Sequence, residues 1–229
     1  MIHPSAPQAL AEDERARSRG HAAKKSNLMV PIRALGENHR TRIAAHLKAL
    51  DGRDRYLRFG YAASDAQIDT YVTGLDFDRD EIFGIFNRHL HLIALAHLAY
   101  PAEGGARRSA EFGVSVLARS RGRGYGARLF ERSAMNARNQ GVRTMAIQML
   151  SENTAMMRIA RHFGATVVQD GAESQGYLQL PPATFSSRLA ESIKERLAQV
   201  NYGLKTHAKH LRERIGRWQT AFRTVRSGG

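Results

Sequence analysis

A short stretch of glycine and basic residues offers the clearest chemistry in this sequence. It lies between an apolar segment, residues 110–117, and an amphipathic segment, residues 124–139, and it reads Arg121, Gly122, Arg123, Gly124, Tyr125 and Gly126. Glycines allow a sharp turn that points several backbone N–H groups in one direction. A helix N-terminus carries about half a positive charge, and arginines add charge-assisted hydrogen bonds. The stretch therefore predicts a diphosphate site where a helix begins.

Two other phosphate-binding motifs do not fit this stretch. A Walker loop ends in Gly-Lys-Ser/Thr, and no such ending is present here. A Rossmann fingerprint spaces its glycines as G-x-G-x-x-G after the first strand, whereas the spacing here is G-x-G-x-G after several apolar segments. The remaining alternative is a glycine-rich loop that binds no ligand.

Candidate acid–base and metal-binding residues are fewer. Glu111 lies in the apolar segment before the glycines, and its position there by itself indicates a solvent-facing strand carboxylate. The chain has ten histidines, but neither the group of His89, His91 and His97 nor the pair His207 and His210 has a matching acidic motif. We therefore assign no metal.

The elements that must position these residues follow from periodicity and turn residues. The predicted strands are residues 30–34, 81–87, 92–100, 110–117, 144–150, 166–169 and 176–180. The predicted helices are residues 37–50, 64–72, 124–139 and 153–163, with Gly141 and Gly164 as stops. Hairpin-connected strands followed by βαβ crossovers predict an α/β (mixed α+β) fold with a mixed sheet of six to seven strands flanked by helices.

Composition divides the 229 residues into three parts. Residues 1–28 are polar and predict a flexible tail, residues 29–182 predict the folded domain, and residues 183–229 predict a basic amphipathic helical extension. The net charge is +14, and residues 184–229 supply ten Lys or Arg against three Glu. This bias favours an anionic partner for residues 184–226, either nucleic acid or a membrane surface, or else it only aids solubility. The apolar stripe in the same residues would also suit a homodimer.

The absence of cysteine excludes disulfides, thiolate nucleophiles and Cys-ligated metals. No run of about 18 apolar residues is present, and the N-terminal residues have no signal-peptide pattern. We therefore expect a cytoplasmic protein.

The glycine stretch also resembles a family motif. Arg121-x-x-Gly124-x-Gly126 after a valine-rich strand is similar to the acyl-CoA-binding motif Q/R-x-x-G-x-G/A of the GNAT N-acetyltransferases. Asn153, followed by a helix that ends near Gly164, resembles the second CoA-contacting element of that family. The predicted order of elements is similar to the GNAT fold over residues 30–180. The resemblance implies a three-layer fold whose sheet is splayed between the fourth and fifth strands.

The resemblance also implies roles for individual residues. Backbone amides at Val114 and Val116 would pair with the pantetheine arm, and the Val116 amide would polarise the thioester carbonyl. The pyrophosphate would lie on Arg121, Gly122, Arg123, Gly124, Tyr125, Gly126 and Ala127. Asn153 would contact the cosubstrate, and Glu111 would deprotonate the amine. The position of the family's usual acid, a tyrosine, holds Ala160 here, which leaves Tyr125, His162 or water for that role.

These roles imply an N-acetyltransferase that uses acetyl-CoA and a primary amine, either a small molecule or a protein lysine, in a ternary complex. The alternative is a non-catalytic protein on the same fold that senses acyl-CoA or binds nucleic acid or membrane. We expect the acceptor pocket to come from loops at residues 51–65 and 102–108. The segment from Asp54 to Phe59 resembles one in bacterial protein-lysine acetyltransferases, and Tyr56, Phe59 and Tyr61 would line the pocket or anchor the core.

Overall fold

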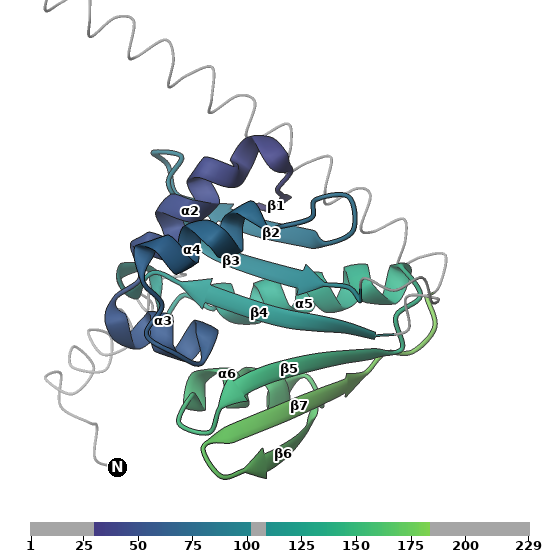
Figure 1. The fold of residues 1–229 in the computed structure, drawn as a ribbon. Coiled ribbons are helices and arrows are strands. Elements are labelled where there is room, and N and C mark those ends of the chain that lie inside the picture. The colour runs from purple at the N-terminus through teal and green to yellow at the C-terminus, as the bar shows by residue number, and fades with distance from the viewer. Residues whose placement is uncertain (1–29, 102–108, 184–229) are drawn as a thin grey trace, which may run out of the picture. The chain divides into compact units, whose positions relative to one another are not determined.

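The computed structural model describes residues 30–101 and 109–183, which form a seven-stranded sheet with helices on both faces (Figure 1). The strands are β1 (Ile32–Ala34), β2 (Glu81–Phe86), β3 (Leu92–Ala99), β4 (Ser109–Val116), β5 (Thr144–Leu150), β6 (Thr166–Asp170) and β7 (Glu173–Gln179). The helices are η1 (Glu37–His39), α2 (Arg40–Lys48), α3 (Gly52–Phe59), α4 (Asp65–Thr73), η2 (Ala118–Ser120), α5 (Tyr125–Asn139) and α6 (Thr154–His162).

The sheet is mixed, as the sequence predicted. Its order is β1-β2-β3-β4-β5-β7-β6, and every neighbouring pair is antiparallel except β4 and β5. Helices α2 and α4 cover one face of the β1–β4 half, and α5 covers the other face (Figure 1). The parallel pair therefore lies where the two halves of the sheet meet, and this position is where an α/β sheet can open into a binding crevice.

Local sequence signals explain most helix boundaries. Ser64 begins α4 with a capping box, in which its side chain and that of Gln67 exchange hydrogen bonds with each other's backbone amides. Gly141 and Gly164 follow α5 and α6 with φ angles of +85° and +83°, a left-handed conformation that glycine adopts without steric cost. These starts and stops confirm the corresponding predictions.

The prediction of a loop over residues 51–65 was wrong for most of that range. Asp51 accepts a hydrogen bond from the Asp54 amide at 2.8 Å and so caps α3, and Gly60 ends the helix with φ +80°. The predicted loop at residues 102–108, the N-terminal tail and the basic extension lie outside the described residues, as do His207 and His210.

Three aromatic side chains hold the two halves of the sheet together on the α5 face. Phe112 on β4 packs edge to face against Phe130 on α5, with ring centroids 5.0 Å apart. Phe130 in turn contacts Phe163, at the end of α6, at 5.0 Å. Phe112 and Phe130 are fully buried, so this cluster fixes β4 against the elements that follow β5. None of the helices in the described part of the chain is long and apolar enough to cross a membrane.

Candidate active site

Strands β4 and β5 pair only at their beginnings and then diverge. Their register joins Ser109 to Thr144, Ala110 to Met145 and Glu111 to Ala146, and no β4–β5 pair follows Glu111. Beyond that point β4 continues to pair with β3, and β5 pairs with β7 over its whole length. This divergence confirms the predicted splay, and a cleft of about 830 Å³ is lined by the residues on both of its sides.

The free edge of β4 presents the amides that the sequence analysis singled out. The Leu117 amide donates to the Ile93 carbonyl of β3 at 3.0 Å. Because N–H groups alternate in direction along a strand, the amides of Val114 and Val116 point away from β3 and toward the cleft. Both residues line the cleft. Among the described residues, the edge therefore offers the N–H groups of Val114 and Val116 to an extended ligand between the strands.

A glycine turn joins this edge to α5. Gly122 and Gly124 both have φ +73°, and apart from their chain neighbours no described residue lies within 4 Å of where a Cβ would stand at either position. No side chain of the residues that the structure describes caps α5, and the first intrahelical bond runs from the Arg128 amide to the Gly124 carbonyl. The amides of the first helical turn are therefore open to an anionic ligand. This arrangement fits a pyrophosphate at the mouth of the cleft.

Gly126 has a different local reason for being glycine. A Cβ there would stand 3.1 Å from the Cδ1 atom of Ile159, so the missing side chain lets α5 approach α6 closely. Most of the predicted cosubstrate residues line the cleft, namely Val114, Val116, Arg121, Gly122, Gly124, Tyr125, Gly126, Ala127 and Asn153. Arg123 is exposed and lies outside this lining.

Arg121 connects the turn to helix α3. Its Nε donates to the Val116 carbonyl at 3.3 Å, and its guanidinium forms an ion pair with Asp54. The second carboxylate oxygen of Asp54 is buried and has no hydrogen-bond partner among the described residues. The Arg121 side chain is half exposed. It can therefore reach a ligand at the turn while it stays anchored.

Asn153 and the candidate acids have well-defined surroundings. The Asn153 side chain accepts a hydrogen bond from the Met156 amide at 3.1 Å and so caps α6 at the edge of the cleft. Ala160 is fully buried. Of the two candidate acids, Tyr125 lines the cleft, whereas His162 packs edge to face against Phe163 outside it.

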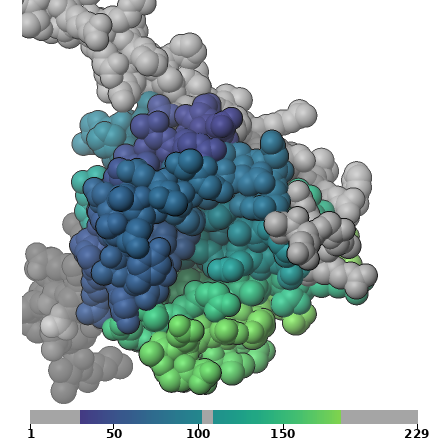
Figure 2. All heavy atoms as spheres, in the orientation of Figure 1, coloured from purple at the N-terminus to yellow at the C-terminus, as the bar shows by residue number. Residues whose placement is uncertain are grey.

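The face of β4 that looks toward α2–α4 carries the polar groups. Side chains alternate along a strand, so Glu111, Gly113 and Ser115 share this face. Glu111 is exposed within the cleft. Ser115 is within 2.8 Å of the buried His46 Nε2, whose Nδ1 is 3.0 Å from the Leu92 carbonyl. In Figure 2 the helices before β2, in purple to blue, and the β5–β7 half, in green, lie on either side of the teal residues between them.

His46 is held neutral by its surroundings. Burial, together with the positive charge of Arg58, lowers the pKa of His46 from 6.5 to about 4, although the hydrogen bond to Leu92 opposes this shift. The neutral ring donates from Nδ1 to the Leu92 carbonyl and accepts from the Ser115 hydroxyl, and so both of its nitrogens are satisfied.

This shift predicts a loss of stability in mild acid. Between pH 6.5 and about 4, His46 is protonated in the unfolded chain but not in the folded chain. The free energy of unfolding therefore falls as the pH falls. The full effect of this one group is about 3 kcal/mol. Urea unfolding at pH 7 and pH 5 should show about 2 kcal/mol of this effect, and the His46→Gln variant should show a shallower pH dependence than the native chain. Equal pH dependence in the two proteins would contradict the assignment.

The sequence analysis missed a second polar group next to the cleft. Arg58 lines the cleft together with Phe59 and Tyr61, and its guanidinium bonds to Tyr71, which contacts His97. Tyr56, in contrast, does not line the cleft. Tyr71 and His97 come from α4 and β3, and no local spacing in the sequence connects them to residue 58.

A comparison with protein-family models shows to which family the chain belongs. Residues 51–165 match the model of the acetyltransferase (GNAT) family. The chain belongs to the GNAT family. The region from α3 to α6 is therefore the part of this chain that it shares with other members of the family. The family's members are acetyltransferases.

Solved structures give the same fold. The GNAT domain of S. lividans PAT is 20% identical, with a TM-score of 0.56 over 65% of this chain and 89% of that domain. A Salmonella typhimurium protein described as an acetyltransferase, solved with acetyl-CoA, is 17% identical, with a TM-score of 0.52 over 67% and 95%. A ribosomal-protein-alanine N-acetyltransferase from Brucella melitensis is 17% identical, with a TM-score of 0.52 over 65% and 99%. No curated protein sequence matches this GNAT chain significantly.

Proposed function

We propose that this protein transfers an acetyl group from acetyl-CoA to a primary amine by direct attack in a ternary complex. The observation that carries the proposal is the unpaired edge of β4, which leads directly into the glycine turn and the uncapped first turn of α5. Family membership and the acetyl-CoA bound to the Salmonella structure support the same cosubstrate.

In this proposal each part of the cleft has one task. Bound acetyl-CoA supplies the activated acyl group as a thioester. The first-turn amides of α5 and Arg121 hold the pyrophosphate, and the edge amides of Val114 and Val116 bind the pantetheine arm. The Val116 amide also donates to the thioester oxygen as negative charge develops there.

Glu111 acts on the acceptor in this scheme. A protonated amine has no lone pair for attack, so a base must remove a proton first. The amine nitrogen then bonds to the acyl carbon as the carbon–sulfur bond breaks, and the thiolate takes up a proton. Glu111 stands in the cleft on the α2–α4 face of β4, where it can accept the proton from the amine.

The test is thiol release from acetyl-CoA with a library of amines, together with calorimetric titration of coenzyme A. The library should hold polyamines, amino acids, aminoglycosides and lysine peptides. We expect heat from coenzyme A and thiol release above the hydrolytic background with at least one amine class. The absence of heat at millimolar coenzyme A would contradict the proposal.

Ala160 favours a second candidate, a GNAT-fold protein that binds acyl-CoA without turning it over. This position, which usually holds the family's acid, carries a fully buried methyl group here. Heat from coenzyme A without thiol release from any amine would support this candidate. Salt-sensitive binding of DNA or anionic vesicles that is lost on truncation before residue 184 would add the proposed anionic partner.

A further inference from the structure

Arg58 is a cation held in a fixed position at the wall of the cleft. It extends from α3 over the backbone of β4, so that a Cβ at Gly113 would stand 2.8 Å from its Cζ and Nη2 atoms. The guanidinium also lies over the rings of Phe59 and Tyr71, at 5.2 and 5.6 Å from their centroids. Such packing removes most of the rotamer freedom of a long side chain before any ligand arrives.

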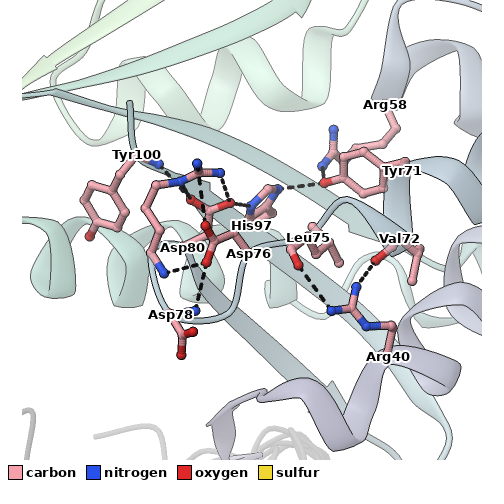
Figure 3. A network of polar contacts seen from close by, with 11 residues as sticks. Arg40, Arg58, Tyr71, Val72, Leu75, Asp76, Asp78, Asp80, His97 and Tyr100 are labelled. Carbon is pink, nitrogen blue, oxygen red and sulfur yellow. Dashed lines mark hydrogen bonds and ion pairs between the residues drawn. The ribbon is translucent and has the colours of Figure 1, made fainter. Parts of the chain in front are cut away.

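A chain of hydrogen bonds behind Arg58 sets its orientation (Figure 3). Arg58 Nη2 donates to the Tyr71 hydroxyl at 2.9 Å, and this hydroxyl is 2.7 Å from His97 Nδ1. His97 Nε2 is 3.0 Å from the carboxylate of Asp80. The chain thus runs from the cleft to a buried carboxylate on the far side of β3.

Asp80 fixes the direction of every bond in this chain. Burial alone would raise the pKa of Asp80, but hydrogen bonds from His97, Arg79 and the Tyr100 amide outweigh it and hold the pKa well below its usual range. The ionised carboxylate accepts from His97 Nε2, which leaves Nδ1 to accept from the Tyr71 hydroxyl. The phenol oxygen can then accept from Arg58.

Arg58 has no acidic partner among the described residues, although acidic side chains are nearby. Asp54 pairs with Arg121, Asp65 pairs with Arg55, and Asp80 pairs with Arg79 and His97. A guanidinium presents five N–H donors in a planar fork. The Tyr71 hydroxyl accepts a hydrogen bond from only one nitrogen of Arg58, Nη2. The remaining donors match a carboxylate in shape and charge.

The positions of Arg58 and Glu111 on β4 limit what can bind to both. Arg58 lies over Gly113, and Glu111 is two residues earlier on the same face of the strand, so the Cα atoms of Gly113 and Glu111 are about 6.6 Å apart. An ammonium group beside Glu111 and a carboxylate beside Arg58 would bridge this distance if a few bonds separate them. An amino acid has this arrangement.

We propose that the acceptor is an amino acid or a similar amine with a nearby carboxylate, and that Arg58, positioned by Tyr71, binds this carboxylate. The inference rests on the proposed acetyl transfer and names its acceptor class. In the assembled site, Glu111 takes the proton from the amine while Arg58 holds the other end of the molecule. The thioester is bound further along the edge of β4, at the Val116 amide.

Matched acceptors test the inference directly. Each of the twenty standard amino acids is compared with its carboxamide and, where one exists, with the amine that lacks the carboxylate. Thiol release from acetyl-CoA gives kcat/KM, and calorimetry with coenzyme A present gives the acceptor's Kd. We expect at least one amino acid to exceed its carboxamide by about 10- to 100-fold in both measurements, the range of a charged hydrogen-bonded pair.

Variants assign the effect to Arg58. In Arg58→Gln, kcat/KM for the amino acid should fall to about that for its carboxamide, so that their ratio is near one. The Kd of coenzyme A should stay unchanged. Tyr71→Phe should raise KM for the amino acid by a smaller factor with little change in kcat, because it loosens the guanidinium without removing it. Arg53→Gln is the matched control, since Arg53 lies on the same helix, is 74% exposed and does not line the cleft.

A second variant covers the case in which Arg58→Gln does not fold. In Gly113→Ala the new methyl group displaces the guanidinium, so it should lower the same ratio. Thiol release that is equally fast with acids, carboxamides and simple amines would overturn the inference and leave the acetyl transfer intact, as would a preference for lysine peptides. Coenzyme binding without turnover of any amine would overturn both.

Discussion

Replacing Gly124 by valine is expected to weaken coenzyme A binding by at least about tenfold, which corresponds to the loss of one good hydrogen bond to a charged group. Gly124 has φ +73° and lines the cleft where α5 begins. A side chain there is strained by about 1–2 kcal/mol and stands beside the first-turn amides, where the pyrophosphate must approach the backbone. Titration calorimetry with coenzyme A measures the change in Kd.

Gly141→Val is the matched control for this variant. Gly141 follows the other end of the same helix and has φ +85°, and in the described part of the chain only its sequence neighbours lie within 4 Å of its Cβ position. Both variants should therefore lose a similar amount of thermal stability, but only Gly124→Val should lose coenzyme binding. If both variants bind coenzyme A as the native chain does, the turn does not bind the pyrophosphate.

The strand, turn and helix start beside the cleft could be predicted because these parts are contiguous in the sequence. The end of β4, the turn and the start of α5 occupy consecutive residues, and their backbone conformation depends mainly on the glycines. Few residues other than glycine adopt a φ of +73° without strain, so the glycines indicate a turn. The apolar strand before them indicates where the turn lies. The splay followed only from the family resemblance, because strand pairing is a tertiary property.

Helix α3 could not be predicted from the sequence because it lacks an apolar stripe. The one buried side chain of its eight residues is that of Asp54, which pairs with Arg121. In the sequence, Asp51-Gly52 indicates a break after the preceding helix, and no local pattern shows that Asp51 also caps the next helix. Periodicity detects a helix by the apolar face that it buries, so a short helix that buries a carboxylate gives no such signal.

The Arg58 chain could not be found from the sequence for a different reason. Its members Arg58, Tyr71, Asp80 and His97 come from α3, α4, the segment before β2, and β3. Each residue has an ordinary local explanation, as a helix surface or strand residue. Only the packing of α3 and α4 against β3 and β4 brings their polar atoms together, and that packing is set by long-range contacts.

Replacing Glu111 by glutamine is expected to lower kcat for acetyl transfer at neutral pH by about 10²- to 10⁴-fold, the usual contribution of a general base. Glutamine has nearly the same shape, so the Kd of coenzyme A and the thermal stability should stay unchanged. Glu131→Gln is the matched control, because Glu131 is an exposed glutamate on α5 that does not line the cleft. Initial rates of thiol release with the best acceptor measure the effect.

The pH dependence of this defect separates a base from a carboxylate that only orients the amine. Primary ammonium groups lose their proton at about pH 8 to 10, so above that range the acceptor arrives neutral and needs no base. The rate of Glu111→Gln should then approach the native rate as the pH rises. A defect that stays constant from pH 7 to pH 10 would mean that Glu111 binds the acceptor without deprotonating it. A kcat within threefold of the native value at neutral pH would mean that Glu111 is a solvent-facing strand residue.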